Sequence, residues 1–382
     1  MALETGKSYL VVSSKPRDEL SALFNRKEGW TGADGAYSIP IGDNRTVWLF
    51  GDTWIGKIKD GRRVDSTMVN NSAAAQELET GEGEQKPLAF FWKSADGKPK
   101  ALIEPERAAS PGAQSQDSQS ESWFWPGDGA AVGGKLYVVL HFVRRKPGDS
   151  SCWGFVGAGH QLAQIDNPLA DPTSWQIHLK PLPSGIEWGN AVLEEGGFLY
   201  VYGEYPSAGE GFFKHPTVLA RISTDKLQNM DMESWQYWCN QTSGGSAGAG
   251  SGSSVGSGLW REQAQDPQIL MADGAPEMTV SRVRGMPGFF ATYIRAGIGQ
   301  DISIRHADKP EGPWSKPQTA YHATLPSKQS FLYGAKAHPE LATRDGEMVI
   351  TYCRNSPSLQ ENVDHPEIYL PHAVTVLIEQ RQ

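Results

Sequence analysis

Two aspartates near the start of the chain, Asp34 and Asp52, have a spacing that could place two carboxylates side by side. Asp34 precedes the apolar run YSIPI, the residues GDN at 42–44 suit a turn, and Asp52 follows a second run, VWLFG. The outer ends of such a hairpin lie at the same rim, because neighbouring strands are about 4.8 Å apart. Paired carboxylates can cleave a glycosidic bond: one protonates the leaving oxygen while the other attacks the sugar or activates water.

The pattern of this first hairpin recurs along the chain. A polar residue in a tight Gly, Pro or Ala setting, followed by two apolar runs, also occurs at Asp128, Asn190, Glu277 and Glu340. Repeated units that cannot bury their own apolar face form arrays. We therefore predict an all-β fold, a five-bladed β-propeller with long surface loops, in which the strand starts converge on one polar pocket. No boundary interrupts the repeats, so residues 1–382 are expected to form a single domain.

The candidate catalytic residues are Asp34, Asp52 and Glu277, of which the first two form the expected pair. A carboxylate beside another resists ionisation and can hold a proton near neutral pH. The predicted substrate-binding residues are Asp128, Asn190, Glu204, Trp54, Trp125, Trp188, Arg282, His338 and Glu340. Glu204 ends the third hairpin as Asp52 ends the first, and the tryptophans beside these markers could be platforms for sugar faces.

Each candidate also has a structural interpretation. An Asp next to Gly is first of all a turn signal, and for Asp43 that interpretation is preferred. The residues that could serve structure alone, through internal hydrogen bonds, ion pairs or packing between sheets, are Asn190, Glu340, Arg282, His338, Trp125 and Trp188. Fivefold recurrence favours function for the acids at the strand starts.

Other segments complete the expected architecture. Outer strands, each leading to an indole buried between neighbouring sheets, are predicted before Trp175, Trp235 and Trp314. The first and last apolar strands, 9–13 and 372–379, should pair with each other or with the last sheet, which would leave no exposed edge. Residues 16–24 predict a short helix. The segments 108–122 and 243–258 have the composition of surface loops.

Composition excludes several classes of partner. The formal net charge of −9 argues against nucleic acid, because phosphate binding needs clustered Lys and Arg. No apolar stretch approaches the roughly 18 residues of a membrane-spanning helix, so we expect no membrane partner. We predict a secreted or periplasmic protein although the given chain starts without a secretory leader, and a cytoplasmic location is the alternative. The sequence does not indicate an oligomeric state.

No motif in the sequence indicates a bound metal or a required cofactor. Cys152, Cys239 and Cys353 are an odd number at wide spacing, which favours neither a disulfide framework nor a metal site. The motifs of serine hydrolases, nucleotide-binding loops and zinc proteases do not occur. A structural calcium ion or another cation in the central channel stays an option because of the many carboxylates.

Several segments resemble a known family. They are GWTGADGAYS at 29–38, WLFGDTW at 48–54, MVNNS at 68–72, GPWS at 312–315 and AKAHPEL at 335–341. In these segments the chain is similar to five-bladed propeller proteins long described as a domain of unknown function, some of which are endo-D-arabinanases. The resemblance spans nearly the whole chain. It implies a glycoside hydrolase acting on furanose polymers or related sugars, with Asp34 and Asp52 as the catalytic pair.

A looser similarity joins the chain to the five-bladed arabinanases, xylosidases and fructosidases. Those enzymes place a carboxylate base or nucleophile on blade one, a supporting Asp on blade two and a Glu acid on blade three. Asp34 and Asp128 match the first two places, but the third hairpin begins with Asn190. The acid would then be Glu204, Asp52 or Glu277.

We therefore expect a hydrolase of O-glycosyl bonds that takes a carbohydrate substrate. The alternative from another class is a non-catalytic carbohydrate-binding propeller that holds a glycan in the same funnel. Carboxylates with perturbed titration would favour the enzyme, whereas carboxylates individually neutralised by Arg would favour the binding protein.

Overall fold

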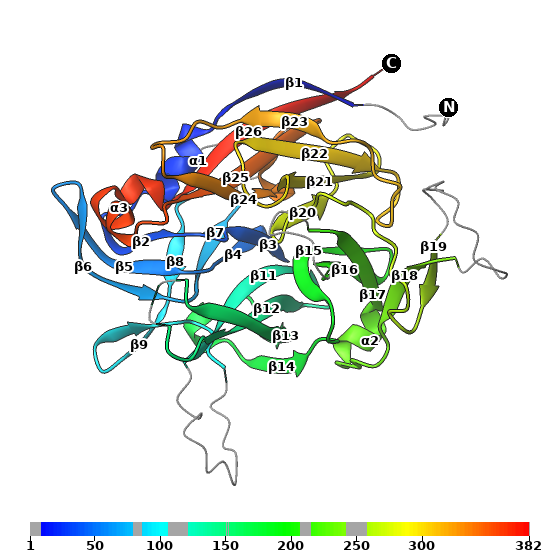
Figure 1. Cartoon of the computed structure of the whole chain (residues 1–382), viewed down its shortest axis with the longest axis horizontal. Helices are drawn as coiled ribbons and strands as arrows, with labels where there is room; N and C mark the ends of the chain where they lie inside the picture. Colours follow the sequence, from blue (N-terminus) through cyan, green and yellow to red (C-terminus); the bar gives the residue numbers. More distant parts are fainter. Residues whose placement is uncertain are drawn as a thin grey trace, which may run out of the picture.

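The computed structural model describes residues 9–78, 86–105, 121–149, 151, 153–206, 215–241 and 258–381. The regular secondary structure of the described chain is almost entirely β-strand, as predicted, and five sheets of four or five strands surround a common centre (Figure 1). Apart from residues 121, 122 and 258, the two loop segments predicted at 108–122 and 243–258 lie outside the described residues.

The five large sheets follow one another along the chain. Of these five, only the last also contains a strand from the N-terminal end of the chain. The first sheet contains β3 (Tyr37–Gly42), β4 (Arg45–Phe50), β7 (Ser72–Glu77) and β8 (Ala89–Phe91). The second contains β11 (Ser122–Val132), β12 (Lys135–Arg145), β13 (Phe155–Ile165) and β14 (Ile177–Pro181). The third contains β15 (Glu187–Glu195), β16 (Phe198–Glu204), β17 (Thr217–Ser223), β18 (Gln236–Asn240) and β19 (Gly258–Arg261).

The fourth sheet contains β20 (Met278–Ser281), β21 (Phe289–Ile294), β22 (Asp301–Ala307) and β23 (Gln318–His322). The fifth contains β24 (Phe331–Ala337), β25 (Glu347–Asn355), β26 (Pro371–Gln380) and β1 (Tyr9–Pro16). In this fifth sheet β1 pairs with β26 and β26 pairs with β25, which confirms both pairings expected of the terminal strands.

Smaller elements extend these sheets. The additional strands are β2 (Glu28–Ala33), β5 (Thr53–Lys59) and β6 (Arg62–Val69), which form one sheet, and the pair β9 (Lys93–Ala95) and β10 (Lys98–Lys100). The described α-helices are α1 (Asp18–Leu23), α2 (Thr224–Gln228) and α3 (Leu359–Asp364). Short 3₁₀ turns occur at η2 (Pro172–Ser174), η3 (Pro339–Leu341) and η4 (Pro366–Ile368). None of the helices in the described part of the chain is long and apolar enough to cross a membrane.

Apolar side chains fill the spaces between successive sheets. Each of five buried clusters joins residues of two neighbouring sheets, and one of them joins Val349 and Leu370 near the chain's end to Trp48 and Phe50 of β4. Trp175 and Trp235 are buried in two of these clusters, as predicted. Since a sheet buries both faces only when it has a neighbour on each side, this packing holds the sheets around the centre.

Tight turns explain how the first hairpin forms. The strands β3 and β4 are joined through Asp43 and Asn44, whose φ values are 51° and 54°. Positive φ at both central residues is the signature of a type I′ turn, whose twist matches that of the flanking strands. Asp43 is therefore a turn former, in agreement with its sequence interpretation.

The buried Arg63 of β6 fixes the segment that follows α3. Its guanidinium donates hydrogen bonds to the carbonyl oxygens of Thr31 at 2.8 Å, Pro366 at 3.1 Å, Tyr369 at 3.3 Å and, through Nη1, Asn362. Gly32 leaves room for this contact, because a Cβ there would come within 2.3 Å of the guanidinium. One cation thus satisfies four carbonyl oxygens and positions Tyr369.

Arg63→Met should lower the free energy of unfolding by about 3 kcal/mol, because buried carbonyl oxygens lose charged donors. Arg62→Met is the matched control: Arg62 is exposed and pairs with Asp364 at the surface, so the loss should stay below about 0.5 kcal/mol. Urea unfolding followed by fluorescence measures both. Equal losses in the two variants would contradict this role of Arg63.

Candidate active site

A cavity of about 430 Å³ opens where the leading strands of the sheets converge. Its polar lining includes residues before β3, after β4, before β17 and before β20, groups from β11, β12 and β24, and residues from the end of β25 to the start of β26. The catalytic candidates Asp34, Asp52 and Glu277 all line it. The structure therefore brings together the three carboxylates selected from the sequence, although they belong to two different sheets.

Backbone hydrogen bonds close the outer end of the first hairpin. The amide of Gly51 donates to the carbonyl oxygen of Asp34 at 3.1 Å, and the amide of Asp34 donates to that of Asp52 at 3.4 Å. Gly51 is needed here, since a Cβ would lie 2.5 Å from Oδ1 of Asp34. The hairpin itself thus sets the two side chains at one edge of the cavity.

Two tyrosines from the end of the chain hold the Asp34 carboxylate. The hydroxyls of Tyr333 and Tyr369 donate to its Oδ2 at 2.7 and 2.8 Å. Burial first, and then the neighbouring Asp52 and Glu277 carboxylates, raise the pKa of Asp34 to about 7, against the two tyrosine hydrogen bonds that lower it. Asp34 is thus an acid that still carries a proton near neutral pH.

The Asp52 carboxylate is held from the second sheet. Its Oδ1 accepts from Nε1 of Trp125 at 2.8 Å and from Nδ2 of Asn70 at 3.2 Å. Burial raises the pKa of Asp52 to about 6, and the same two hydrogen bonds oppose the rise. Within the described residues, Oδ2 of Asp52 has no hydrogen-bond partner, so this oxygen is available to a ligand.

The third carboxylate has a buried cationic partner. Lys336 is fully buried, and its ammonium forms an ion pair with Glu277 and donates to the carbonyl oxygen of Gly334 at 3.1 Å. The ammonium also lies 4.2 Å from the centre of the Tyr37 ring. Sequence reasoning missed Lys336; a signal was present, because this lysine interrupts the otherwise apolar end of β24.

Aromatic rings cover much of the remaining wall. Trp125 meets Phe155 edge to face, with ring centres 4.9 Å apart. Trp153 is half exposed at the cavity, and Phe331 lies beside Tyr333. Trp125 was the only one of these rings predicted from the sequence. Apolar ring faces beside carboxylates are suited to the C–H faces and hydroxyls of a sugar.

Several predicted binding residues have internal partners and do not line the cavity. The Asp128 carboxylate accepts from the amides of Gly129 and Val192, both at 2.8 Å, and joins β11 to β15. Asn190 donates to the carbonyl oxygen of Ala275 at 2.7 Å. Both side chains are buried, and both lie at irregularities in strand pairing. A bulge changes the direction of a side chain, which explains why these two point into the sheet contacts.

His338 and Glu340 belong to a buried polar network with Ser38 and Thr351. His338 Nδ1 lies 2.6 Å from the Ser38 hydroxyl and its Nε2 lies 2.7 Å from that of Thr351. Ser38 also donates to Glu340. Burial lowers the pKa of His338 to about 3 and raises that of Glu340 to about 7. Both residues therefore make the internal hydrogen bonds that a purely structural role predicts.

The remaining predicted residues do not line the cavity either. The ring of Trp54 lies 5.6 Å from the Arg63 guanidinium, and Trp188 is buried with its Nε1 bonded to the Pro183 carbonyl oxygen at 2.9 Å. Arg282 is exposed and pairs with Glu195 at 2.7 Å. Glu204 does not line the cavity itself, but it bonds to His215, which does.

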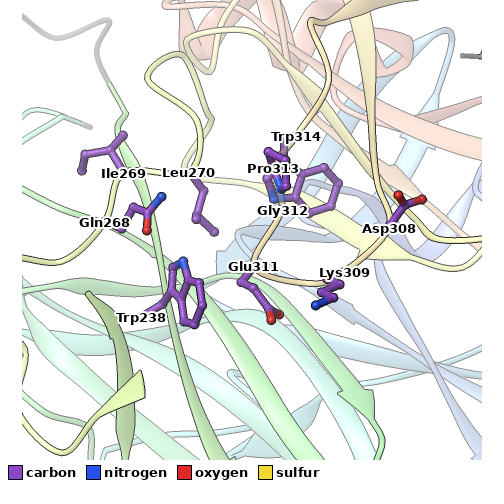
Figure 2. A pocket seen from close by; sticks show the side chains of 10 residues that line it. All are labelled: Trp238, Gln268, Ile269, Leu270, Asp308, Lys309, Glu311, Gly312, Pro313 and Trp314. Carbon is purple, nitrogen blue, oxygen red and sulfur yellow. The ribbon is translucent and has the colours of Figure 1, made fainter. Parts of the chain in front are cut away.

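A second cavity, of about 240 Å³, lies away from the three carboxylates (Figure 2). Trp238 and Trp314 contribute ring faces, and Asp308 and Glu311 come from one loop. Figure 2 shows these two acidic side chains pointing in different directions. The first cavity is therefore the better candidate for chemistry, because only there do carboxylates meet.

The carboxylates offer little to a metal ion. In the described ranges, no group of three or more His, Cys, Asp or Glu side chains is arranged to hold one. The Lys336 ammonium already occupies the place of a cation beside Glu277. A calcium ion or another cation in the central channel stays a prediction for which these residues supply no ligand set.

No curated protein matches this chain. A crystal structure of a "putative hydrolase" from Bacteroides ovatus ATCC 8483 is similar over 98% of this chain and 93% of that one, with a TM-score of 0.69 and 18% identity, which shows a shared fold. A GH43_1 enzyme from Xanthomonas citri gives a TM-score of 0.43 at 14% identity, over 97% of this chain and 90% of that one.

An exo-1,5-alpha-L-arabinanase from a bovine ruminal metagenomic library gives 0.41 at 10% identity, over 94% and 95% of the two chains. Residues 18–377, which are most of the chain, match the family described as a domain of unknown function (DUF5005), and this chain belongs to that family.

Proposed function

We propose that this protein is a glycoside hydrolase that cleaves a neutral, furanose-containing polysaccharide of the arabinan type, and that its five sheets act as the blades of a propeller around the site. The observation that carries the proposal is the Asp34–Asp52 pair, two neighbouring carboxylates with raised pKa values in an aromatic cavity. Two carboxyl groups across a glycosidic bond are what its hydrolysis requires.

Asp34 and Asp52 lie in different environments, which favour different roles in the reaction. Asp34, with the higher pKa of about 7, carries the proton that goes to the leaving oxygen. Asp52, with a pKa of about 6 and a free Oδ2, is the base that activates water or the nucleophile that attacks the sugar. The Glu277 carboxylate, which pairs with Lys336, raises the pKa of Asp34 and so helps Asp34 to retain its proton.

The lining also indicates the substrate class. Three carboxylates and several ring faces line the cavity, whereas Lys336 is buried behind Glu277. A neutral sugar suits this surface better than a uronate or a phosphorylated sugar, which the carboxylates would repel. The furanose preference rests on the resemblance of the first-hairpin segments to endo-D-arabinanases, and the cavity size is in the range of ligand sites.

The non-catalytic alternative fits the charges less well. A pure sugar-binding protein would neutralise each carboxylate, for instance with an Arg. Among the described residues neither Asp34 nor Asp52 forms an ion pair, and their donors are neutral tyrosine, tryptophan and asparagine groups. Neutral donors leave both carboxylates free to exchange protons.

Asp34→Asn and Asp52→Asn should each lower kcat by roughly 10²- to 10⁴-fold, the contribution typical of a positioned acid or base. The assay is release of reducing ends from a panel of arabinans, fructans and aryl furanosides, with the anomer of the first product followed by NMR. Asp43→Asn, in the turn of the same hairpin, is the control and should retain activity. Full activity in both test variants would refute the assignment.

The pH dependence of kcat/KM should be a narrow bell. Activity should rise as Asp52 ionises near pH 6 and fall as Asp34 loses its proton near pH 7. Because the two groups interact, the apparent values belong to the pair. A rate that keeps increasing to pH 9 would contradict a protonated Asp34 in the reaction.

Tyr333→Phe should move the alkaline limb of that bell upwards by roughly one pH unit or less, the value of one neutral hydrogen bond. The sign follows from the donor: its hydroxyl stabilises ionised Asp34, so removing it favours the protonated form. Tyr321→Phe is the control: its ring packs near Tyr352, and among the described residues the tyrosine hydroxyls that bond Asp34 are those of Tyr333 and Tyr369. A downward shift, or equal shifts in both variants, would contradict the assignment.

A further inference from the structure

Two histidines that the proposed reaction does not use also line the main cavity. His141 lies in β12 and His215 lies just before β17. Each ring has one nitrogen bonded to a protein group, while its other nitrogen has no hydrogen-bond partner among the described residues. A neutral imidazole has one N–H donor and one acceptor nitrogen, so the bonded nitrogen decides what the other one offers.

The position of the hydrogen on the His141 ring is set by two neighbouring side chains, those of His160 and Glu187. Nε2 of His160 lies 3.2 Å from the Glu187 carboxylate and 3.1 Å from Nδ1 of His141. An ionised carboxylate can only accept, so its charge at this ion-pair distance favours a hydrogen over a lone pair on Nε2 of His160. That single hydrogen is directed at Nδ1 of His141, which accepts it. Burial holds both rings neutral, with the pKa of His141 at about 4 and that of His160 at about 3.

The hydrogen of His141 is therefore on Nε2. Two glycines leave this nitrogen uncovered: a Cβ at Gly127 would come within 2.9 Å of it and one at Gly189 within 3.5 Å. His141 thus offers a hydrogen-bond donor to whatever fills the cavity.

The same reasoning places the hydrogen of the His215 ring on Nδ1 instead of Nε2. Its Nδ1 lies 2.7 Å from Oε2 of Glu204, and the carboxylate again can only accept. The hydrogen of the neutral ring is then on Nδ1, and Nε2 keeps its lone pair. This nitrogen lies beside Gly297, another residue of the cavity wall, where a Cβ would be 3.4 Å away.

We propose that His141 and His215 form a binding subsite for one neutral sugar unit. His141 donates from Nε2 to a hydroxyl oxygen, and Nε2 of His215 accepts a hydroxyl hydrogen. Sugar hydroxyls are both donors and acceptors, so a donor and an acceptor held at fixed places in one cavity select a sugar by the positions of its hydroxyls. The subsite deepens the proposed function, since it would hold a unit of the same chain. His160, Glu187 and Glu204 are positioning residues that act through the two rings.

The tautomers can be measured without any substrate. Protein labelled with ¹⁵N-histidine is studied by two-bond ¹H–¹⁵N correlation at pH 8, and signals are assigned with His141→Phe and His215→Phe. The expected result is a protonated Nε2 with a bare Nδ1 for His141 and the reverse for His215. A protonated Nδ1 on His141, or a protonated Nε2 on neutral His215, would overturn the proposal.

Binding is measured on the Asp52→Asn protein, which keeps the subsite but should not consume the ligand. A panel of neutral oligosaccharides, with arabino- and fructo-oligosaccharides among them, is titrated by calorimetry and by the histidine signals. The best ligand should shift the signals of His141 and His215. His141→Phe and His215→Phe should each raise its Kd roughly threefold to tenfold, the value of one neutral hydrogen bond, and His141→Gln should recover part of the loss through its amide donor.

His322→Phe is the matched control, because His322 is exposed and also bonds an aspartate, Asp301, at 2.7 Å. Its signals and the Kd of that variant should not change. Unaltered Kd values in both cavity variants, or no binding of any neutral sugar, would overturn the subsite. Sugar binding with the expected shifts, in a wild-type protein that hydrolyses nothing, would support the subsite and refute the hydrolase proposal, so the two failures are distinguishable.

Discussion

The closure of the first hairpin is the constraint on which the site depends. Two backbone hydrogen bonds hold the ends of β3 and β4 together, and this places the carboxyl groups of Asp34 and Asp52 at one edge of the cavity. The rest of the fold supplies their donors. Tyr333 and Tyr369 come from the last sheet and its connection, and Trp125 comes from the second sheet. The site exists only when sheets distant in sequence have packed around the centre.

This arrangement opposes stability at neutral pH. A carboxyl whose folded pKa is raised stabilises the folded state below its unfolded pKa, and that contribution is lost as the pH rises through the folded value. For Asp34 this window runs from about 4 to about 7. The cost is typical of functional sites, where unfavourable charges are held in place by the surrounding structure. One buried ammonium, that of Lys336, offsets part of the negative charge.

The sequence was informative wherever local geometry decides position. The spacing of Asp34 and Asp52 across a predicted turn was enough to pair them, and the recurrence of the pattern was enough to predict an all-β fold. The sequence was less informative about the direction in which a side chain points. Asp128 and Asn190 occupy the same place in their hairpins as Asp34 does, yet irregular pairing in β11 and β15 directs them to backbone groups of a neighbouring segment.

Long-range partners could not be predicted at all. The tyrosines that bond Asp34 are 299 and 335 positions away in sequence, and the roles of His141, His215 and Lys336 depend on groups that lie elsewhere in the chain. Hairpin rules relate neighbours in sequence, whereas these contacts depend on how whole sheets pack. The described cavity therefore adds to the predicted carboxylates a set of donors, rings and imidazoles that no repeat marks.

The most direct test of the central claim, that two crowded carboxyl groups share the site, is the pH dependence of stability. The free energy of unfolding in urea is measured at pH 5 and pH 8 for the wild type, Asp34→Asn and the double variant Asp34→Asn, Asp52→Asn. The account predicts that stability falls from pH 5 to pH 8 most in the wild type, less in the single variant and least in the double variant. The same decline in all three proteins would contradict it.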